Sequence, residues 1–146
     1  KLAVDGEINL NTSNSKIRVS DVSAGGDIIC ETSNSPVSIK RAAAENISVK
    51  TSSGSIDING VAASRELNLK TSNGKISFEL VNVGSALVCK TSNSSVEGVI
   101  DGKITDYTIS AETSNASSTL PSHMRGGDKI LDIKTSNGSI SVSFTD

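Results

Sequence analysis

Three lysines occupy the same place in a repeated phrase of this sequence. Lys50, Lys70 and Lys90 each stand directly before a Thr-Ser-Asn or Thr-Ser-Ser phrase. If successive repeats stack at the spacing of β-strands, these side chains lie in a row about 5 Å apart. Like charges in a row repel, and an anionic polymer such as a wall glycan or teichoic acid, or a lipid headgroup surface, would relieve the repulsion. The simpler alternative is that these lysines keep the surface soluble and protect strand edges.

Catalysis has weaker support. Polysaccharide lyases and hydrolases built on β-helices need carboxylates gathered on one face. Asp57 and Glu97 share one place in the repeat but lie two repeats apart, with Ser77 at the place between them. His123 and Arg125 fall in an irregular segment, where solenoids often place binding residues, so we treat both as candidate ligand-binding residues. We expect a protein without enzymatic activity, and a polysaccharide-active enzyme is the weakest alternative.

The sequence contains no motif for binding a metal ion, a cofactor or nucleic acid. The chain lacks the Cys/His spacing of zinc sites, the glycine-aspartate nonapeptide of calcium-binding β-rolls and the glycine motifs that hold cofactors. A formal net charge of −2 predicts no general attraction to nucleic acid. No apolar run reaches the roughly 18 residues that a transmembrane helix requires. Because the first residue is Lys, we expect the chain to be a piece of a longer protein.

The elements that would position these residues follow from the repeat itself. The phrase begins at Thr12, Thr32, Thr51, Thr71, Thr91, Thr113 and Thr135, at intervals of 20, 19, 20, 20, 22 and 22 residues. A period of this length is typical of a solenoid built from one repeated unit. The chain has only three aromatic residues, Phe78, Tyr107 and Phe144, so its core must consist of thin layers of aliphatic side chains.

The apolar residues form columns around each repeat threonine. Four and two residues before it, and five and seven residues after it, 26 of the 28 positions are apolar, and Gly98 and Ser118 are the exceptions. Alternation with period two on both sides of the phrase predicts two half-buried strands per repeat. A looser third side follows, with one further inward residue ten positions after the threonine: Val22, Ala42, Val61 and Val81.

The phrase itself predicts a corner between the two strands. By the same alternation, the threonine points inward and the following serine outward, which argues against an exposed threonine array of the kind that binds ice. Asparagine tolerates the backbone of a tight bend, and its amide can bond to the amide of the next coil. We therefore predict a structural ladder of corner amides formed by Asn14, Asn34, Asn73, Asn93, Asn115 and Asn137.

An antiparallel sheet with a hairpin turn at each Asn-Gly or Asn-Ser is the rival interpretation. Hairpins do not require the same turn residues seven times at one period, whereas stacked coils do. We predict an all-β fold, a right-handed parallel β-helix of about seven coils of 19–22 residues, forming a single domain over residues 1–146 and about 34 Å long. Cys30 and Cys89 would lie three coils apart, too far for a disulfide, so we expect two buried free thiols.

The phrase Lys134-Thr135-Ser136-Asn137-Gly138-Ser139-Ile140 and its copies resemble the β-helical repeats of a family of bacterial domains of unknown function that bears the label of adhesin. The resemblance covers essentially the whole chain. It implies a right-handed β-helix and an association with the cell envelope or the extracellular side, with a cytoplasmic location as the alternative. It supplies no catalytic residue.

Two functions remain as hypotheses. One is a surface-exposed binding or adhesion module for an envelope glycan, an anionic polymer or a protein. The other is a scaffold that self-associates through the open strand edges of its terminal coils. The sequence leaves the oligomeric state open.

Overall fold

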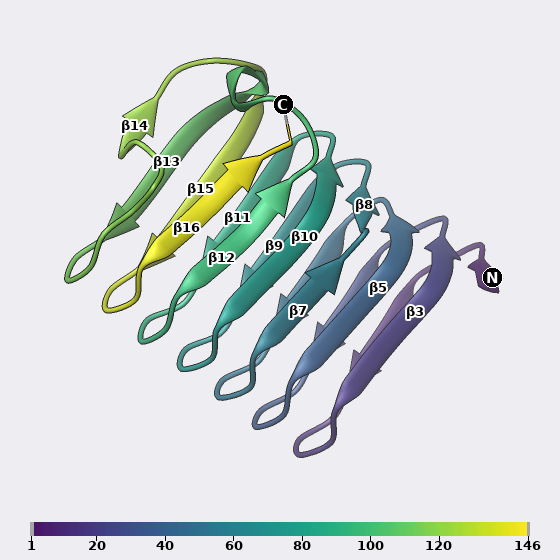
Figure 1. Ribbon diagram of the computed structural model, residues 1–146. Helices are drawn as coiled ribbons and strands as arrows, with labels where there is room; N and C mark the ends of the chain where they lie inside the picture. Colours follow the sequence, from purple (N-terminus) through teal and green to yellow (C-terminus); the bar gives the residue numbers. More distant parts are fainter. Residues whose placement is uncertain (1, 146) are drawn as a thin grey trace.

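Two parallel sheets face each other along the whole molecule. In the computed structural model, which describes residues 2–145, the chain winds as a right-handed β-solenoid of about seven coils (Figure 1). Most coils contribute one strand to each sheet and turn between the two strands at the Thr-Ser-Asn corner; in the sixth repeat the strand of sheet A is reduced to a single bridge. The strand pairs are parallel, except for one short antiparallel pair at the end of the stack. The predicted fold class is therefore confirmed, and the hairpin alternative is wrong.

We call the two sheets sheet A and sheet B. Sheet A contains β1 (Leu2–Val4), β3 (Ile17–Ala24), β5 (Val37–Ala44), β7 (Ile56–Asn59), β8 (Ala62–Ala63), β10 (Ile76–Val83), β12 (Val96–Ile100) and β16 (Ile140–Phe144). Sheet B contains β2 (Ile8–Asn11), β4 (Ile28–Glu31), β6 (Ile47–Lys50), β9 (Glu66–Lys70), β11 (Ala86–Lys90), β13 (Tyr107–Thr113), β14 (His123–Met124) and β15 (Lys129–Thr135). A 3₁₀ turn, η1 (Ile104–Asp106), leads into β13.

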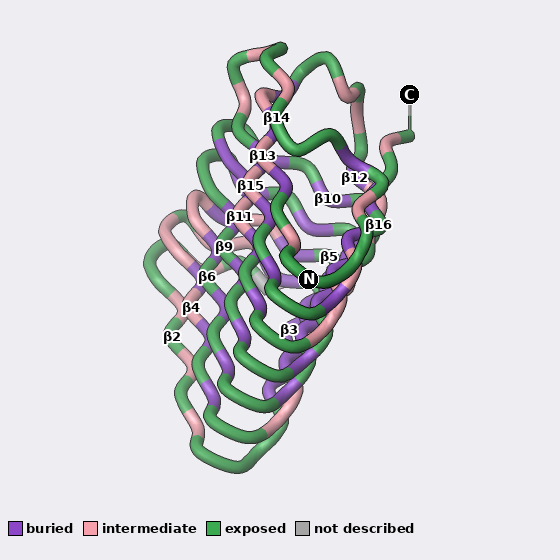
Figure 2. The backbone as a smooth tube through the Cα atoms, turned by 90° about the vertical axis from the view of Figure 1, so that its left-hand side faces the viewer, coloured by how far each residue is buried: buried purple, intermediate pink, exposed green. Residues whose placement is uncertain are grey.

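The predicted apolar columns form the core between the sheets. Figure 2 shows buried residues along the inside of the coils and exposed residues at the corners. In the first coil, Ile8 and Leu10 are only half-buried, because no further coil covers that end of sheet B. Gly98, which seemed to interrupt a column, leaves room for its neighbour: an added Cβ would lie 2.3 Å from the Phe78 ring. Cys30 and Cys89 are buried and free, as predicted.

From the third corner on, the inward threonine hydroxyl donates to a carbonyl of the adjacent corner, whereas the buried Thr32 hydroxyl has no hydrogen-bond partner among residues 2–145. The Thr71 hydroxyl donates to the carbonyl of Gly54 at 3.0 Å and accepts from the amide of Gly74 at 3.2 Å. Thr135 repeats this arrangement with Ser94 and Gly138. The backbones approach so closely that a Cβ on Gly138 would lie 1.9 Å from the Ser94 oxygen. A small residue at this place is thus a steric requirement of stacking.

The corner asparagines bond to one another from coil to coil. Asn34 donates its side-chain amide to Asn14 at 2.9 Å. A second run joins Asn73, Asn93, Asn137 and Asn115 in that order, with amide contacts of 2.6 to 2.8 Å. Ser53 stands at the corner between the two runs and divides the ladder. Stacked amides of this kind favour exact register between neighbouring coils.

Strands of sheet A bend where those of sheet B do not. Nine residues after the repeat threonine, Asp21, Arg41, Gly60 and Leu80 all have φ between 51° and 62°. The bend leaves two consecutive residues facing outward and turns the next residue inward. Val22, Ala42, Val61 and Val81 are therefore buried, as predicted for the third side.

The last two coils do not stack in chain order. Strand β15, from the seventh repeat, pairs with β11 of the fifth on one side and with β13 of the sixth on the other. The sixth repeat therefore forms the end of the stack, and the seventh lies inside it (Figure 1). The predicted row of Lys50, Lys70 and Lys90 keeps chain order, but the sixth and seventh repeats do not.

The irregular segment after the sixth corner caps this end. Its short strand β14 pairs antiparallel with β13, through Ile109 with Met124 and Ser110 with His123. The matching strand of sheet A is reduced to one bridge, between Ser118 and Ile140. Tyr107 is buried beneath the cap, with its ring centroid 5.5 Å from that of Phe144. Burial and the nearby carboxylates of Asp106 and Asp101 raise the pKa of Tyr107 to about 12.

Candidate functional site

Four lysines, rather than three, form one continuous row on the outer face of sheet B. Lys50 pairs in register with Lys70, Lys70 with Lys90, and Lys90 with Lys134. Neighbouring strands lie about 4.8 Å apart, so four ammonium groups follow one line along the stack. We call this row, Lys50, Lys70, Lys90 and Lys134, the lysine file.

Lys134 joins the file because of the changed coil order. In the sequence it lies beyond Glu112 and therefore seems to be separated from Lys90. Its signal was nevertheless visible, because Lys134 precedes Thr-Ser-Asn-Gly just as Lys70 does. Sequence reasoning missed the residue because it assumed that neighbours in the chain are neighbours in the stack.

In the register column of the file, as far as the structure describes it, acidic residues stand at the two ends. Glu31 is in register with Lys50 at one end, and Glu112 with Lys134 at the other. At the second end the Lys134 ammonium lies 3.8 Å from a Glu112 carboxylate oxygen. Within residues 2–145, Lys50, Lys70 and Lys90 make no ion pair. Within the described residues, three adjacent cations therefore lack an ion pair, and Lys70 and Lys90 have lysines as neighbours in register on both sides.

A row of serines runs beside the lysines on the same face. The residue after each repeat threonine points outward, and Ser52, Ser72, Ser92 and Ser136 are all exposed. Their hydroxyls have no hydrogen-bond partner in the part of the chain that the structure describes. In each of these repeats the lysine stands just before the inward threonine and the serine just after it. The surface thus offers ammonium groups and free hydroxyls side by side, and both are hydrogen-bond donors that suit a negatively charged ligand.

A hollow lies at each end of the file. Near Lys50, a hollow of about 260 Å³ is lined by Glu31, Ser33 and Ser52 among others. Near Lys134, a hollow of about 500 Å³ lies under the cap and is lined by Glu112, Ser136 and His123. The structure therefore brings His123 to the file. Arg125 is exposed and lines neither hollow, so it is separate from this group.

The carboxylates considered for catalysis lie on sheet A. Asp57 and Glu97 flank Ser77 in register on three neighbouring strands. Glu97 forms an ion pair with Lys75, with 2.8 Å between the ammonium and carboxylate atoms. Among the described residues, no group of three or more His, Cys, Asp or Glu side chains could hold a metal ion. In the same range, no helix has the length and apolar character needed to cross a membrane.

Comparison with known proteins places the chain in a family. No curated protein and no solved structure matches it. The model of one family, Toastrack DUF4097, matches residues 3–146, which is nearly the whole chain and includes the lysine file, the corner ladder and the cap. The chain therefore belongs to the Toastrack DUF4097 family.

Proposed function

We propose that this Toastrack domain is a non-enzymatic binding module of the bacterial cell envelope that holds an anionic polymer along the lysine file. The observation that supports this proposal most directly is the file itself, with four cations in register and acids only at its ends. Adhesion to an envelope glycan or polymer follows from the same chemistry. The ligand lies across the coils, with one negative charge for each coil that it crosses.

The spacing of the file favours a linear polyanion. Adjacent lysines are about 4.8 Å apart, so the four span roughly 14 Å. A flexible polymer with regularly spaced phosphates or carboxylates can pair with several of them at once and displace their counterions. Each exposed pair contributes little by itself, so affinity depends on the number of pairs formed. Binding should accordingly weaken steeply as the salt concentration rises.

The test is a binding titration with purified poly(glycerol phosphate) teichoic acid at several salt concentrations. The variant Lys50→Gln/Lys70→Gln/Lys90→Gln should bind at least about tenfold more weakly and show a smaller salt dependence. The matched control, Lys75→Gln/Lys103→Gln/Lys129→Gln, removes the same charge from positions outside the file and should bind normally. Equal losses in both variants would show attraction to overall charge alone and would contradict the proposal. Neutral dextran serves as the ligand control.

Self-association is the second candidate, and one observation favours it. Strands β1 and β2 form the outer edges of the first coil, and in residues 2–145 each has a partner on one side only. At the other end of sheet B, β14 covers β13, so head-to-tail stacking meets a cap. The open edges therefore suit a head-to-head dimer better than a fibre. Light scattering over a range of concentrations tests this: a dimer abolished by Leu10→Lys, but not by the file variant, would support the scaffold.

A further inference from the structure

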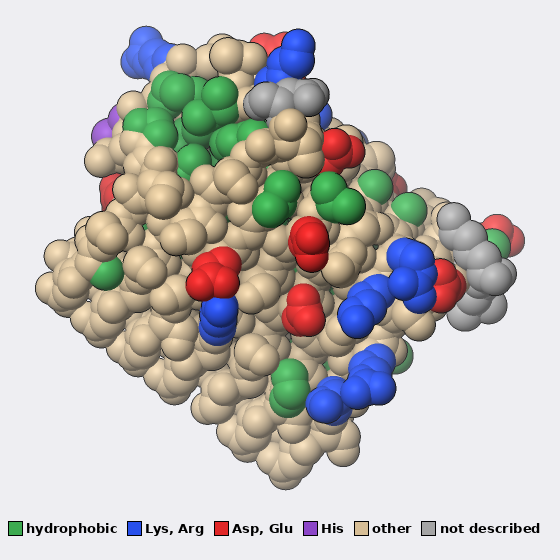
Figure 3. All heavy atoms as spheres, viewed as in Figure 1, with side chains coloured by type: hydrophobic (Ala, Val, Ile, Leu, Met, Phe, Trp, Pro, Cys, Tyr) green, Lys and Arg blue, Asp and Glu red, His purple; other side chains and the backbone are tan. Residues whose placement is uncertain are grey.

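A second group of cations surrounds a hollow on the opposite sheet. The hollow, of about 480 Å³, lies on the outer face of sheet A over β3, β5 and β7. Figure 3 shows Lys and Arg side chains gathered over β3 and β5, and acidic side chains over β7 and β10. Nothing in the polymer-binding proposal uses this surface, because the lysine file lies on sheet B.

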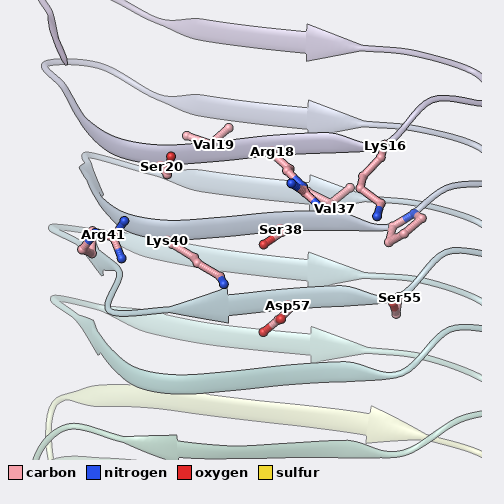
Figure 4. Close-up of a pocket in the computed structure, with 11 residues that line it drawn as sticks. Lys16, Arg18, Val19, Ser20, Val37, Ser38, Lys40, Arg41, Ser55 and Asp57 are labelled. Atoms are coloured by element: carbon pink, nitrogen blue, oxygen red, sulfur yellow. The ribbon is translucent and has the colours of Figure 1, made fainter. Parts of the chain in front are cut away.

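The position of the hollow follows from the bend in sheet A. Ser38 forms its floor, and its neighbours in register are Arg18 on β3 and Asp57 on β7. The bend makes Lys40 and Arg41 face outward one after the other, so they form one wall. In Figure 4, Lys40 extends from this wall toward Ser38 and Asp57, while Arg18 and Lys16 approach from β3 and the segment before it.

Among the residues that the structure describes, three of the four cations have no ion-pair partner. Arg41 is held by Asp21 through two hydrogen bonds, of 2.7 and 2.9 Å, and their charges cancel. Lys16, Arg18 and Lys40 make no ion pair or side-chain hydrogen bond within residues 2–145. With Asp57 on the opposite wall, the unpaired groups leave two positive charges around the hollow.

The floor supplies hydroxyl donors. The hydroxyls of Ser20, Ser38 and Ser55 have no hydrogen-bond partner in the described chain. No aromatic residue lines the hollow, so it lacks a surface on which a nucleobase or a sugar ring could stack. Unpaired cations together with free hydroxyls are the donors that recognise a compact anion. Because a phosphate monoester carries −1.5 to −2 charges at neutral pH, its charge matches that of the hollow.

We propose that this hollow binds the phosphate group of a phosphorylated sugar or polyol. Lys16, Arg18 and Lys40 hold the phosphate oxygens, and the serine hydroxyls complete their hydrogen bonds. Asp57 accepts a hydrogen bond from a hydroxyl of the same ligand, which distinguishes this ligand from inorganic phosphate. The site is independent of the lysine file, and the two together would let one domain hold anionic groups on opposite faces.

The experiment is an amide chemical-shift titration of the whole chain with glycerol phosphate, inorganic phosphate and glycerol. Glycerol phosphate should give saturable shifts at Ser20, Ser38 and Ser55, inorganic phosphate weaker ones at the same residues, and glycerol none. The variant Arg18→Gln/Lys40→Gln should bind glycerol phosphate about tenfold more weakly. In Asp57→Ala, which removes the hydrogen-bond acceptor, the preference for glycerol phosphate over inorganic phosphate should disappear.

The matched control is Lys70→Gln/Lys90→Gln, which removes two charges from the lysine file and should leave this titration unchanged. Equal weakening in both double variants, or shifts spread over both sheets, would overturn the proposal. Loss of teichoic acid binding in the control, with glycerol phosphate binding retained, separates this site from the file. Vesicles of phosphatidylcholine, with and without phosphatidic acid, identify the source of the ligand. Binding only to the vesicles that contain phosphatidic acid indicates a phosphomonoester at a membrane surface. Binding to neither kind of vesicle indicates a soluble ligand.

Discussion

The two sheets of this solenoid differ in the shape of their strands and therefore in how they arrange the side chains on their outer surfaces. Strands β3, β5 and β10 of sheet A are eight residues long and bend at a residue with positive φ. Among the described residues, no strand of sheet B contains such a residue. A straight strand repeated in register places its outward side chains in a line, as in the lysine file. A bent strand turns two consecutive side chains outward and forms a wall, as around the Ser38 hollow.

The charges on the two sheets differ as well. On sheet A, neighbouring coils pair opposite charges, as in Asp21 with Arg41 and Lys75 with Glu97. Glu45 and Arg65 do the same on the third side of the coils. On sheet B, four like charges follow one another, and within residues 2–145 the one ion pair of this row is at its end. Ion pairs between neighbouring coils thus occur on sheet A and on the third side, beside the unpaired cations of the Ser38 hollow, whereas the lysine file places four like charges in register.

The largest expected loss of stability comes from a substitution that forces the seventh coil out of its place between the fifth and the sixth. In Gly138→Val, the new side chain would meet the Ser94 carbonyl oxygen, since even a Cβ would lie 1.9 Å away. We expect the free energy of unfolding in urea to fall by about 3 kcal/mol. Ala116→Val, at the equivalent place in the exposed corner of the sixth repeat, is the control and should change stability little. Equal effects would contradict the stacking order.

The same coil order shows where prediction from sequence ends. The core columns and the corners were predictable, because burial imposes a period of two within a strand and stacking imposes the repeat. The order of the last coils was not predictable. The fifth and seventh repeats present the same apolar columns, so the columns do not decide which of the two lies beside a given coil. The Ser38 hollow was missed because the bend of sheet A was not foreseen: at the four bend positions, Asp21, Arg41 and Leu80 do not signal a positive φ, and only Gly60 does.

The next effect concerns the inward face of sheet B, where two thiols lie behind the charged surface. Burial raises the pKa of Cys30 to about 11, and burial together with Asp132 also raises that of Cys89. Because the folded state favours the neutral thiol, this stability is fully present below the pKa of an unfolded cysteine, near 9, and is lost as the pH rises through 11. We expect Cys30 alone to account for a loss of about 3 kcal/mol over this range, since its pKa is raised by about two units.

Urea denaturation between pH 8 and pH 11 measures this loss, and Cys30→Ala/Cys89→Ala provides the reference. The reference variant keeps the lysines, so their contribution to the pH dependence cancels in the difference. Its stability should decline less steeply than that of the natural chain. Parallel curves for the two proteins would show that the thiols do not contribute.

A smaller effect compares the charges of the two sheets directly. Lys75→Glu replaces the attraction to Glu97 by repulsion and should lower the free energy of unfolding by about 0.5 to 1 kcal/mol. Lys70→Glu makes the same chemical change between Lys50 and Lys90, where it relieves repulsion, and should raise stability by about 0.5 kcal/mol. Both effects should shrink in high salt. Destabilisation by both substitutions would refute the difference between the sheets.

The smallest effect concerns the bend that gives sheet A its shape. Leu80 has a φ of 51° and an exposed fraction of 50%, so its side chain contributes little burial to offset a backbone conformation that L-residues disfavour. Asparagine adopts this conformation more readily, and Leu80→Asn should raise the free energy of unfolding by about 0.5 kcal/mol. Leu80→Ala removes the same apolar side chain without easing the backbone and should give no such gain. If the two variants unfold at the same urea concentration, strain at the bend is not what limits stability there, and the bend is held by its neighbours on β7 and β12.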